Sequence, residues 1–333
     1  MSDTTLNATG SESIADTRLH DIVVGVDGSD ESFAALRWAL NEASLTGQQV
    51  NAVFAWSHSW DMGSEPEDEE QWAEVRHDIA QRLRDWVSEA SQGMTLNEDH
   101  VKLTSVKATG TSALLEIGRD AQQSVVGRRS LGRVARWFLG SLSASLAEAA
   151  EVPVTVVRIL DDEESNVQDA IANALTPSEN TVTYDLPGSP LPRSQRPIVV
   201  GVDGSETSRH ALRFAIDLAA LHHAPLQVMF CWQLKDLGVI EGYENAIAPI
   251  AVGQKRAERI LDELLDSVEI PAAGIPDDFQ IESHAFHISA AKGLIAASRY
   301  ARHLVVGSRG LSGLDAHFLG SVSKQIVNFA DCT

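Results

Sequence analysis

The sequence repeats itself over most of its length. The eight residues IVVGVDGS at 22–29 recur without change at 198–205, 176 positions later. Near the end of each copy, FLGS at 138–141 recurs at 318–321, 180 positions later. Matching blocks in the same order, with a small change in spacing, indicate two copies of one domain that differ by short loop insertions. We therefore expect one fold, formed twice.

The chain of 333 residues is long enough for two domains that each bury a core of their own. The segment between the copies is rich in proline, serine and charged residues, which is typical of a linker that buries too little apolar surface to fold. The expected divisions are a flexible N-terminal tail at 1–20, domain 1 at 21–160, an acidic, proline-rich linker at 161–196 and domain 2 at 197–333.

Short β-branched runs alternate with longer amphipathic segments along the first copy, which predicts strands alternating with helices. Strands are expected at 22–26, 50–56, 101–108, 124–127 and 152–159, and helices at 32–45, 67–90, 112–121 and 141–150. Because right-handed crossovers place such helices on both faces of a parallel sheet, the fold class is α/β, with two tandem, doubly wound, five-stranded parallel sheets.

The second copy departs from this pattern at its end. It stops at Asp331-Cys332-Thr333, directly after its last expected helix, whereas the first copy continues into a fifth strand. Either the sequence is truncated there or this copy lacks its last strand, and in both cases the second sheet is expected to have four strands.

Composition excludes several classes of protein. The net charge of −21 disfavours binding to nucleic acid phosphates or anionic membrane surfaces, and no apolar run has the roughly 20 residues of a membrane span. Residues 1–20 lack the features of a secretory signal, so we expect a cytoplasmic protein. The two cysteines, Cys231 and Cys332, are expected to be reduced.

Two loops of the second copy are candidate ligand-binding segments. Open α/β sheets bind ligands beyond the carboxyl ends of their strands, where Asp203-Gly204 follows the first expected strand and Gly307 the fourth. Gly307 and Gly310, then nine residues, then Gly320-Ser321 at the start of a helix, have the spacing of an anion-binding loop. The alternatives are a helix cap at Asp203-Gly204-Ser205 and a glycine-rich turn without a ligand.

These motifs resemble the universal stress protein family, whose ATP-binding members carry glycine, two residues, glycine, nine residues, then glycine with serine or threonine. The resemblance covers nearly all of both copies and implies a Rossmann-like fold of the adenine nucleotide alpha hydrolase type. It also implies ATP as the ligand, with Mg²⁺, and a regulatory role in the stress response. The residues that it assigns to ATP in domain 2 are Asp203, Gly204, Cys231, Gly307, Gly310, Gly320 and Ser321.

The first copy offers a second, weaker candidate site. Its corresponding residues are Asp27, Gly28, Ala55, Gly127, Ser130, Gly140 and Ser141. Ser130 replaces a glycine where the backbone would approach a phosphate, which weakens the site. Arg128, Arg129 and Arg133 in the same loop could instead pair with phosphate charge.

No nucleophile, general base and orienting group can be assembled from the sequence, so we expect no enzyme and no catalytic residues, although slow incidental ATP hydrolysis is compatible with this. No complete set of metal ligands is visible either. The alternative function is an interaction or dimerisation module of the same fold that needs no nucleotide. Either the two halves contact each other asymmetrically as a pseudo-dimer, or two chains form a homodimer through Val154–Arg158.

Overall fold

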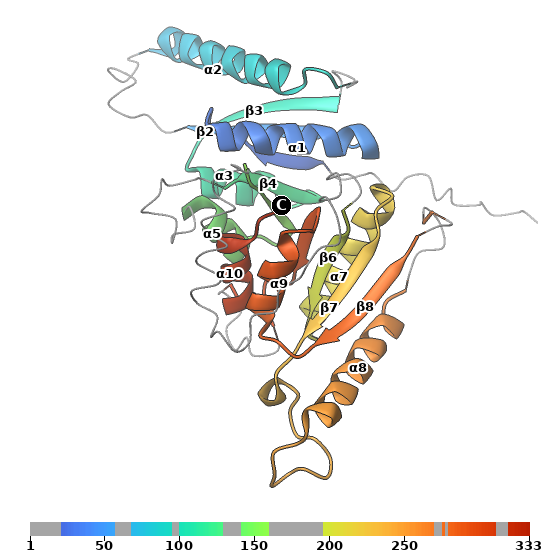
Figure 1. The fold of residues 1–333 in the computed structure, drawn as a ribbon. Helices are drawn as coiled ribbons and strands as arrows, with labels where there is room; N and C mark the ends of the chain where they lie inside the picture. Colours follow the sequence, from blue (N-terminus) through green and yellow to red (C-terminus); the bar gives the residue numbers. More distant parts are fainter. Residues whose placement is uncertain are drawn as a thin grey trace, which may run out of the picture.

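The computed structural model contains two α/β domains, each built on a parallel sheet (Figure 1). It describes residues 21–56, 68–94, 100–128, 141–159, 196–269, 275–276, 279–310 and 319–333. The expected tail at 1–20, nearly all of the expected linker, and the candidate residues Ser130 and Gly140 lie outside the described residues.

Domain 1 confirms the expected alternation of strands and helices. Its elements are β1 (Ile22–Gly25), α1 (Asp30–Thr46), β2 (Val50–Trp56), α2 (Glu69–Ala90), β3 (Val101–Lys107), α3 (Gly110–Ile117), β4 (Gln123–Gly127), α5 (Ser141–Ala149) and β5 (Val154–Val157). The strand order is β3-β2-β1-β4-β5, and every pairing is parallel. The sheet is therefore doubly wound, and its winding direction reverses between β1 and β4.

Within the described residues, domain 2 repeats this arrangement with four strands, as expected from the sequence. Its elements are β6 (Ile198–Val202), α7 (Glu206–Leu221), β7 (Leu226–Cys231), η6 (Leu234–Asp236), α8 (Ile250–Asp266), β8 (Ile281–Phe286), α9 (Ala290–Ser298), β9 (His303–Val306) and α10 (Ser321–Phe329). The strand order among the described residues is β8-β7-β6-β9. At the edge of β9, the Leu304 amide donates to the Thr333 carbonyl.

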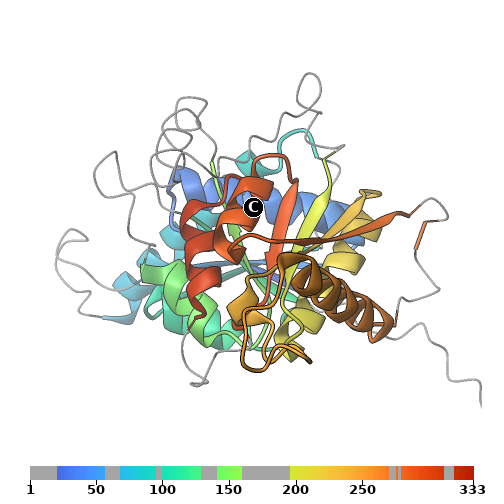
Figure 2. The ribbon, with the colours of Figure 1, turned by 60° about the horizontal axis from the view of Figure 1, so that its bottom comes forward.

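Local sequence explains where the main helices begin and how they pack. Ser29 and Ser205 are the N-caps of α1 and α7, and each side chain accepts a hydrogen bond from the amide three residues later. In domain 2, apolar residues of α7 and α8 pack on one face of the sheet and those of α9 and α10 on the other (Figures 1 and 2). Each sheet is thus the middle of three layers, which leaves its carboxyl edge for the connecting loops.

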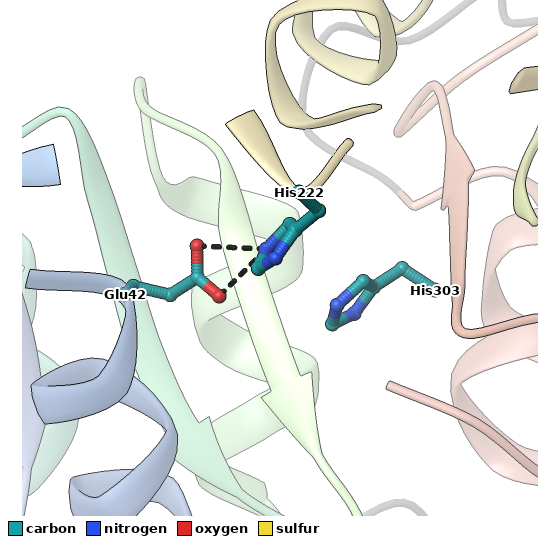
Figure 3. A group of neighbouring side chains, drawn as sticks. All are labelled: Glu42, His222 and His303. Atoms are coloured by element: carbon teal, nitrogen blue, oxygen red, sulfur yellow. Dashed lines mark hydrogen bonds and ion pairs between the residues drawn. The ribbon is translucent and has the colours of Figure 1, made fainter. Parts of the chain in front are cut away.

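The two domains meet at a buried group of polar side chains (Figure 3). Glu42 of α1 contacts His222, which follows α7, with carboxylate oxygens 2.9 and 3.1 Å from the imidazole Nε2. Arg302, just before β9, places Nη2 2.7 Å from Nδ1 of the same ring. Because a guanidinium has only donors, Nδ1 accepts this bond and the proton lies on Nε2, which donates to Glu42.

A second contact joins the end of domain 2 to domain 1. Arg158, which follows β5, donates through Nη1 to the carbonyl of Ala330 at 2.6 Å and to Oδ1 of Asp331 at 3.0 Å. Arg128, which follows β4, donates to the same carbonyl at 3.5 Å. The halves therefore contact each other asymmetrically, which is one of the two arrangements that the sequence left open.

None of the helices in the described ranges combines the length and the apolar character that crossing a membrane requires.

We expect Glu42→Ala to lower the free energy of unfolding, because the Nε2–H of His222 then loses its acceptor in a buried position. A buried donor without an acceptor costs about 1–3 kcal/mol. The matched control is Glu89→Ala on the exposed surface of α2, for which a change below about 0.5 kcal/mol is expected. Urea unfolding followed by circular dichroism measures both, and equal transition midpoints would show that the Glu42–His222 contact adds nothing.

Candidate functional site

The two candidate loops of domain 2 lie at the same edge of its sheet. β6 and β9 pair in parallel, with Gly201 opposite Val306. Asp203 follows β6 and Gly307 follows β9, so both loops leave the sheet at neighbouring carboxyl ends. This edge is also where the winding direction reverses, which is the position at which open α/β sheets bind ligands.

The loop after β6 is a tight turn held by its own side chains. Asp203 Oδ1 accepts a hydrogen bond from the amide of Ser205 at 3.0 Å. Gly204 has φ of +85°, a left-handed conformation that favours glycine. Ser205 caps α7, so the helix-cap interpretation is correct for Ser205, while the other oxygen of Asp203 faces the loop after β9.

The loop after β9 lies against this turn so closely that one of its residues has no room for a side chain. A Cβ on Gly310 would lie 2.5 Å from Oδ2 of Asp203. The Thr207 hydroxyl donates to the carbonyl of Arg309 at 2.7 Å, which fixes the loop to the first turn of α7. A Cβ on Gly307 would lie 3.2 Å from that hydroxyl. A side chain at position 310 would have to displace the Asp203 carboxylate, and one at position 307 would crowd Thr207.

The start of α10 lies against the same loop. The amide of Gly320 donates to the carbonyl of Ser308 at 2.8 Å, and the Ser323 hydroxyl donates to the carbonyl of Gly307 at 2.7 Å. Gly320 is the N-cap and makes no side-chain capping bond. Ser321 is the exposed first helical residue. The first amides of α10 have no acceptor within the helix and carry the positive end of its dipole.

Cys231 lies at the carboxyl end of β7, and its side chain faces α9. A Cβ on Gly293 would lie 2.6 Å from its Sγ, so the thiol packs directly against the helix backbone. Burial raises the pKa of the Cys231 thiol to about 12. The Cys231 side chain is thus packed as a small apolar group at the end of β7.

Domain 1 has the same turn but different surroundings. Asp27 Oδ1 accepts from the amide of Ser29 at 3.0 Å, and Gly28 has φ of +82°. A Cβ on Gly28 would lie 2.7 Å from the indole of Trp86, whereas its counterpart Gly204 faces Ile260 at 3.3 Å. The wall beside this turn is therefore a bulky indole in domain 1 and an aliphatic side chain in domain 2.

The rest of the domain 1 candidate site is only partly described. A Cβ on Gly127 would lie 2.2 Å from the carbonyl oxygen of Glu31, so packing against α1 already requires this glycine without any ligand. Ala55 is the last but one residue of β2, at the expected strand end. Ser141 begins α5.

One cluster of potential metal ligands was missed at the sequence level. Atoms of Glu42, His222 and His303 lie within 4.8 Å of one another, and all three residues are buried (Figure 3). Because Nε2 of His222 carries a proton and Nδ1 accepts from Arg302, neither ring nitrogen offers a free lone pair to a cation. The cationic Arg302 also disfavours a metal ion, so the geometry favours a hydrogen-bonded contact between the domains.

Comparisons with known proteins agree on one family. The family model described as "Universal stress protein family" matches residues 19–158 and 195–333. A universal stress protein of Mycolicibacterium smegmatis is 29% identical over 321 residues, covering 93% of this chain and 94% of the relative. Universal stress protein Rv2623 of Mycobacterium tuberculosis is 28% identical over 316 residues, with 93% of each chain covered.

Solved structures are similar in fold. The crystal structure of a universal stress protein from Archaeoglobus fulgidus has a TM-score of 0.57 at 14% identity and covers 95% of this chain and 97% of that chain. A protein of unknown function from Pseudomonas aeruginosa has a TM-score of 0.51 at 14% identity and covers 94% of this chain and 90% of that chain. At these identities the likeness is one of fold.

The raised pKa of Cys231 predicts slow reaction with thiol reagents. With a pKa of about 12, the reactive thiolate is a minute fraction at pH 8, and it increases tenfold per pH unit because the pKa lies well above this range. We expect modification of Cys231 in a Cys332→Ser background to be about 1,000-fold slower in the folded chain than in denaturant, where thiols have a pKa of about 8.5. A rate that levels off near pH 9 in the folded protein would contradict the shift.

Proposed function

The chain belongs to the universal stress protein family, and from that premise we propose that it is an ATP-binding regulatory protein of the stress response, with the nucleotide held mainly in domain 2. One observation carries the proposal. Asp203, the glycine loop at 307–310 and the N-terminus of α10 converge at one edge of the sheet. Their arrangement suits a ligand with a negatively charged tail, such as the phosphates of ATP.

The charges in this group suit an anionic tail at one end. The first turn of α10 offers backbone amides and a positive dipole end, and Arg309 lies in the adjoining loop. Phosphate oxygens are acceptors only, so donors of this kind match them. Asp203 provides an acceptor on the β6 side, where a ribose hydroxyl or an amino group of a base could donate to it.

Mg²⁺ would accompany the phosphates rather than occupy a site made by the protein alone. Among the described residues of the site, Asp203 supplies the one carboxylate, and its Oδ1 is engaged by Ser205. Mg²⁺ usually keeps several waters and binds through phosphates plus one or two carboxylates, so this donor set fits an ion brought in with ATP.

Domain 1 is a weaker candidate for the same ligand. Trp86 lies against Gly28, where domain 2 has the smaller Ile260, so the space beside the turn is differently shaped. Arg128, which the sequence assigned to phosphate as one alternative, donates to the carbonyl of Ala330. We therefore propose that domain 2 binds ATP more tightly than domain 1.

We also propose that the chain has no dedicated enzymatic activity. The described side chains of the site provide one carboxylate and several hydroxyl groups, of which Ser205, Thr207 and Ser323 are already hydrogen bonded to one another or to the backbone. A nucleophile activated by a general base is not formed by this set. Hydrolysis of bound ATP would then be slow and incidental.

A nucleotide-independent interaction module is the second candidate function. The observation in its favour is that the bonds from Thr207 and Ser323 hold the glycine loop in place without any ligand. Such a module would use the same fold and the same loops as a fixed surface for a partner.

Nucleotide carried through purification distinguishes these functions. Freshly purified protein is denatured, and released nucleotide is identified and counted by chromatography. We expect close to one ATP per chain, strongly reduced in Asp203→Ala and retained in Asp27→Ala. The pair is matched because both aspartates accept a hydrogen bond from the serine amide two residues later.

Two other outcomes of this experiment would change the proposal. Two nucleotides per chain, each lost with its own aspartate, would restore domain 1 as an equal site. No released nucleotide, together with no binding when ATP and Mg²⁺ are added, would contradict the proposed function and favour the interaction module.

A further inference from the structure

Helix α10 connects the candidate nucleotide site of domain 2 with domain 1. Its N-terminal end contacts the glycine loop through the amide of Gly320 and the hydroxyl of Ser323. Its C-terminal end is Ala330, which is followed by Asp331, and both are contacted by arginine side chains of domain 1. The helix has nine residues, so about 13 Å separates the two ends.

The contact at the C-terminal end is a charge pair between a buried arginine and a partly buried aspartate, with several further bonds. Arg158 has 6% of its side chain exposed and Asp331 has 16%, and Nη1 of the arginine lies 3.0 Å from Oδ1. The other oxygen of Asp331 lies 3.7 Å from Nε of Arg299, which belongs to domain 2. The Asp331 amide donates to the Ser298 hydroxyl at 2.8 Å. One carboxylate is thus bound by an arginine from each domain.

These bonds fix the position of α10. Arg158 donates to the carbonyl of Ala330, the C-cap residue of the helix, at 2.6 Å. A cation at a helix C-terminus interacts favourably with the negative end of the dipole, and a hydrogen bond from it satisfies a carbonyl that has no partner within the helix. Because a short helix moves as a unit, holding this end also holds the amides at the other end.

From this geometry we infer that Arg158 and Asp331 are positioning residues for the nucleotide of domain 2, so that domain 1 sets the affinity of its neighbour for ATP. The inference rests on the proposed function. Without the contact, α10 would have to be ordered when the phosphates bind. The free energy spent on that ordering would lower the affinity for ATP. By thermodynamic linkage, bound ATP strengthens the contact by the same factor.

Among the described residues, this contact is formed at the end of the last helix of domain 2 and not at the equivalent place in domain 1. The positions of domain 1 that correspond to Arg299 and Asp331 are Arg119 and Glu151, and both are exposed. In the described part of domain 1, the C-terminal end of α5 therefore has no counterpart of the Asp331 carboxylate held between two arginines. Glu151 is for that reason the matched control position for Asp331.

The test compares Mg²⁺–ATP binding to the full chain by isothermal titration calorimetry. We expect Asp331→Asn and Arg158→Gln each to weaken binding by about fivefold or more, in the range usual for coupled sites. Glu151→Gln should bind like the unmodified protein, and Asp331→Glu should recover part of the loss. All titrations are run well below the unfolding temperature, with circular dichroism verifying the fold.

A second readout separates positioning from general destabilisation. If ATP and Asp331 are coupled, adding ATP should slow hydrogen exchange of the amides at 326–331, and Asp331→Asn should abolish this protection. Equal ATP affinity in Asp331→Asn and in the unmodified chain would overturn the inference while leaving the proposed function intact. Equal weakening in Glu151→Gln would also overturn it, and no binding by the unmodified chain would overturn both.

Discussion

The close approach of Asp203 and Gly310 is the constraint on which the site depends. Parallel pairing of β6 and β9 brings two turns to neighbouring strand ends, and the carboxylate of one then occupies the volume that a side chain on the other would need. Two hydroxyl groups hold the same loop: Thr207 of α7 donates to it from one side, and Ser323 of α10 donates to it from the other. This packing accounts for the glycine at position 310.

Most of the fold could be predicted from the sequence, because it follows from local patterns. The structure contains the repeated domain predicted from IVVGVDGS, the alternation of strands and helices, and, among the described residues, a second sheet of four strands. The turn after the first strand of each copy could also be predicted, since a turn glycine and a capping serine are signals within a few residues. The sequence places the start of the last helix at Gly320-Ser321, and in the structure Gly320 is the N-cap and Ser321 the first helical residue.

Contacts between the domains could not be predicted in this way. Glu42 lies 180 positions from His222 and Arg158 lies 173 from Asp331, and each pair depends on how two folded domains meet. No periodicity within either copy marks these residues. Arg128 is the clearest example. Its residue type and its place in the loop suggested that it pairs with phosphate, whereas in the structure it donates to a backbone carbonyl of the other domain.

The Ala330–Asp331 contact has a consequence for how the protein can be studied in parts. Domain 2 cut out on its own would lose Arg158, leaving a half-buried carboxylate and a helix end exposed where a neighbour used to lie. It would also lose Glu42 as the acceptor for His222. An excised domain 2 therefore differs from the intact chain at the surface where the two domains meet. Its properties in isolation are a poor measure of what the same residues do in the intact chain.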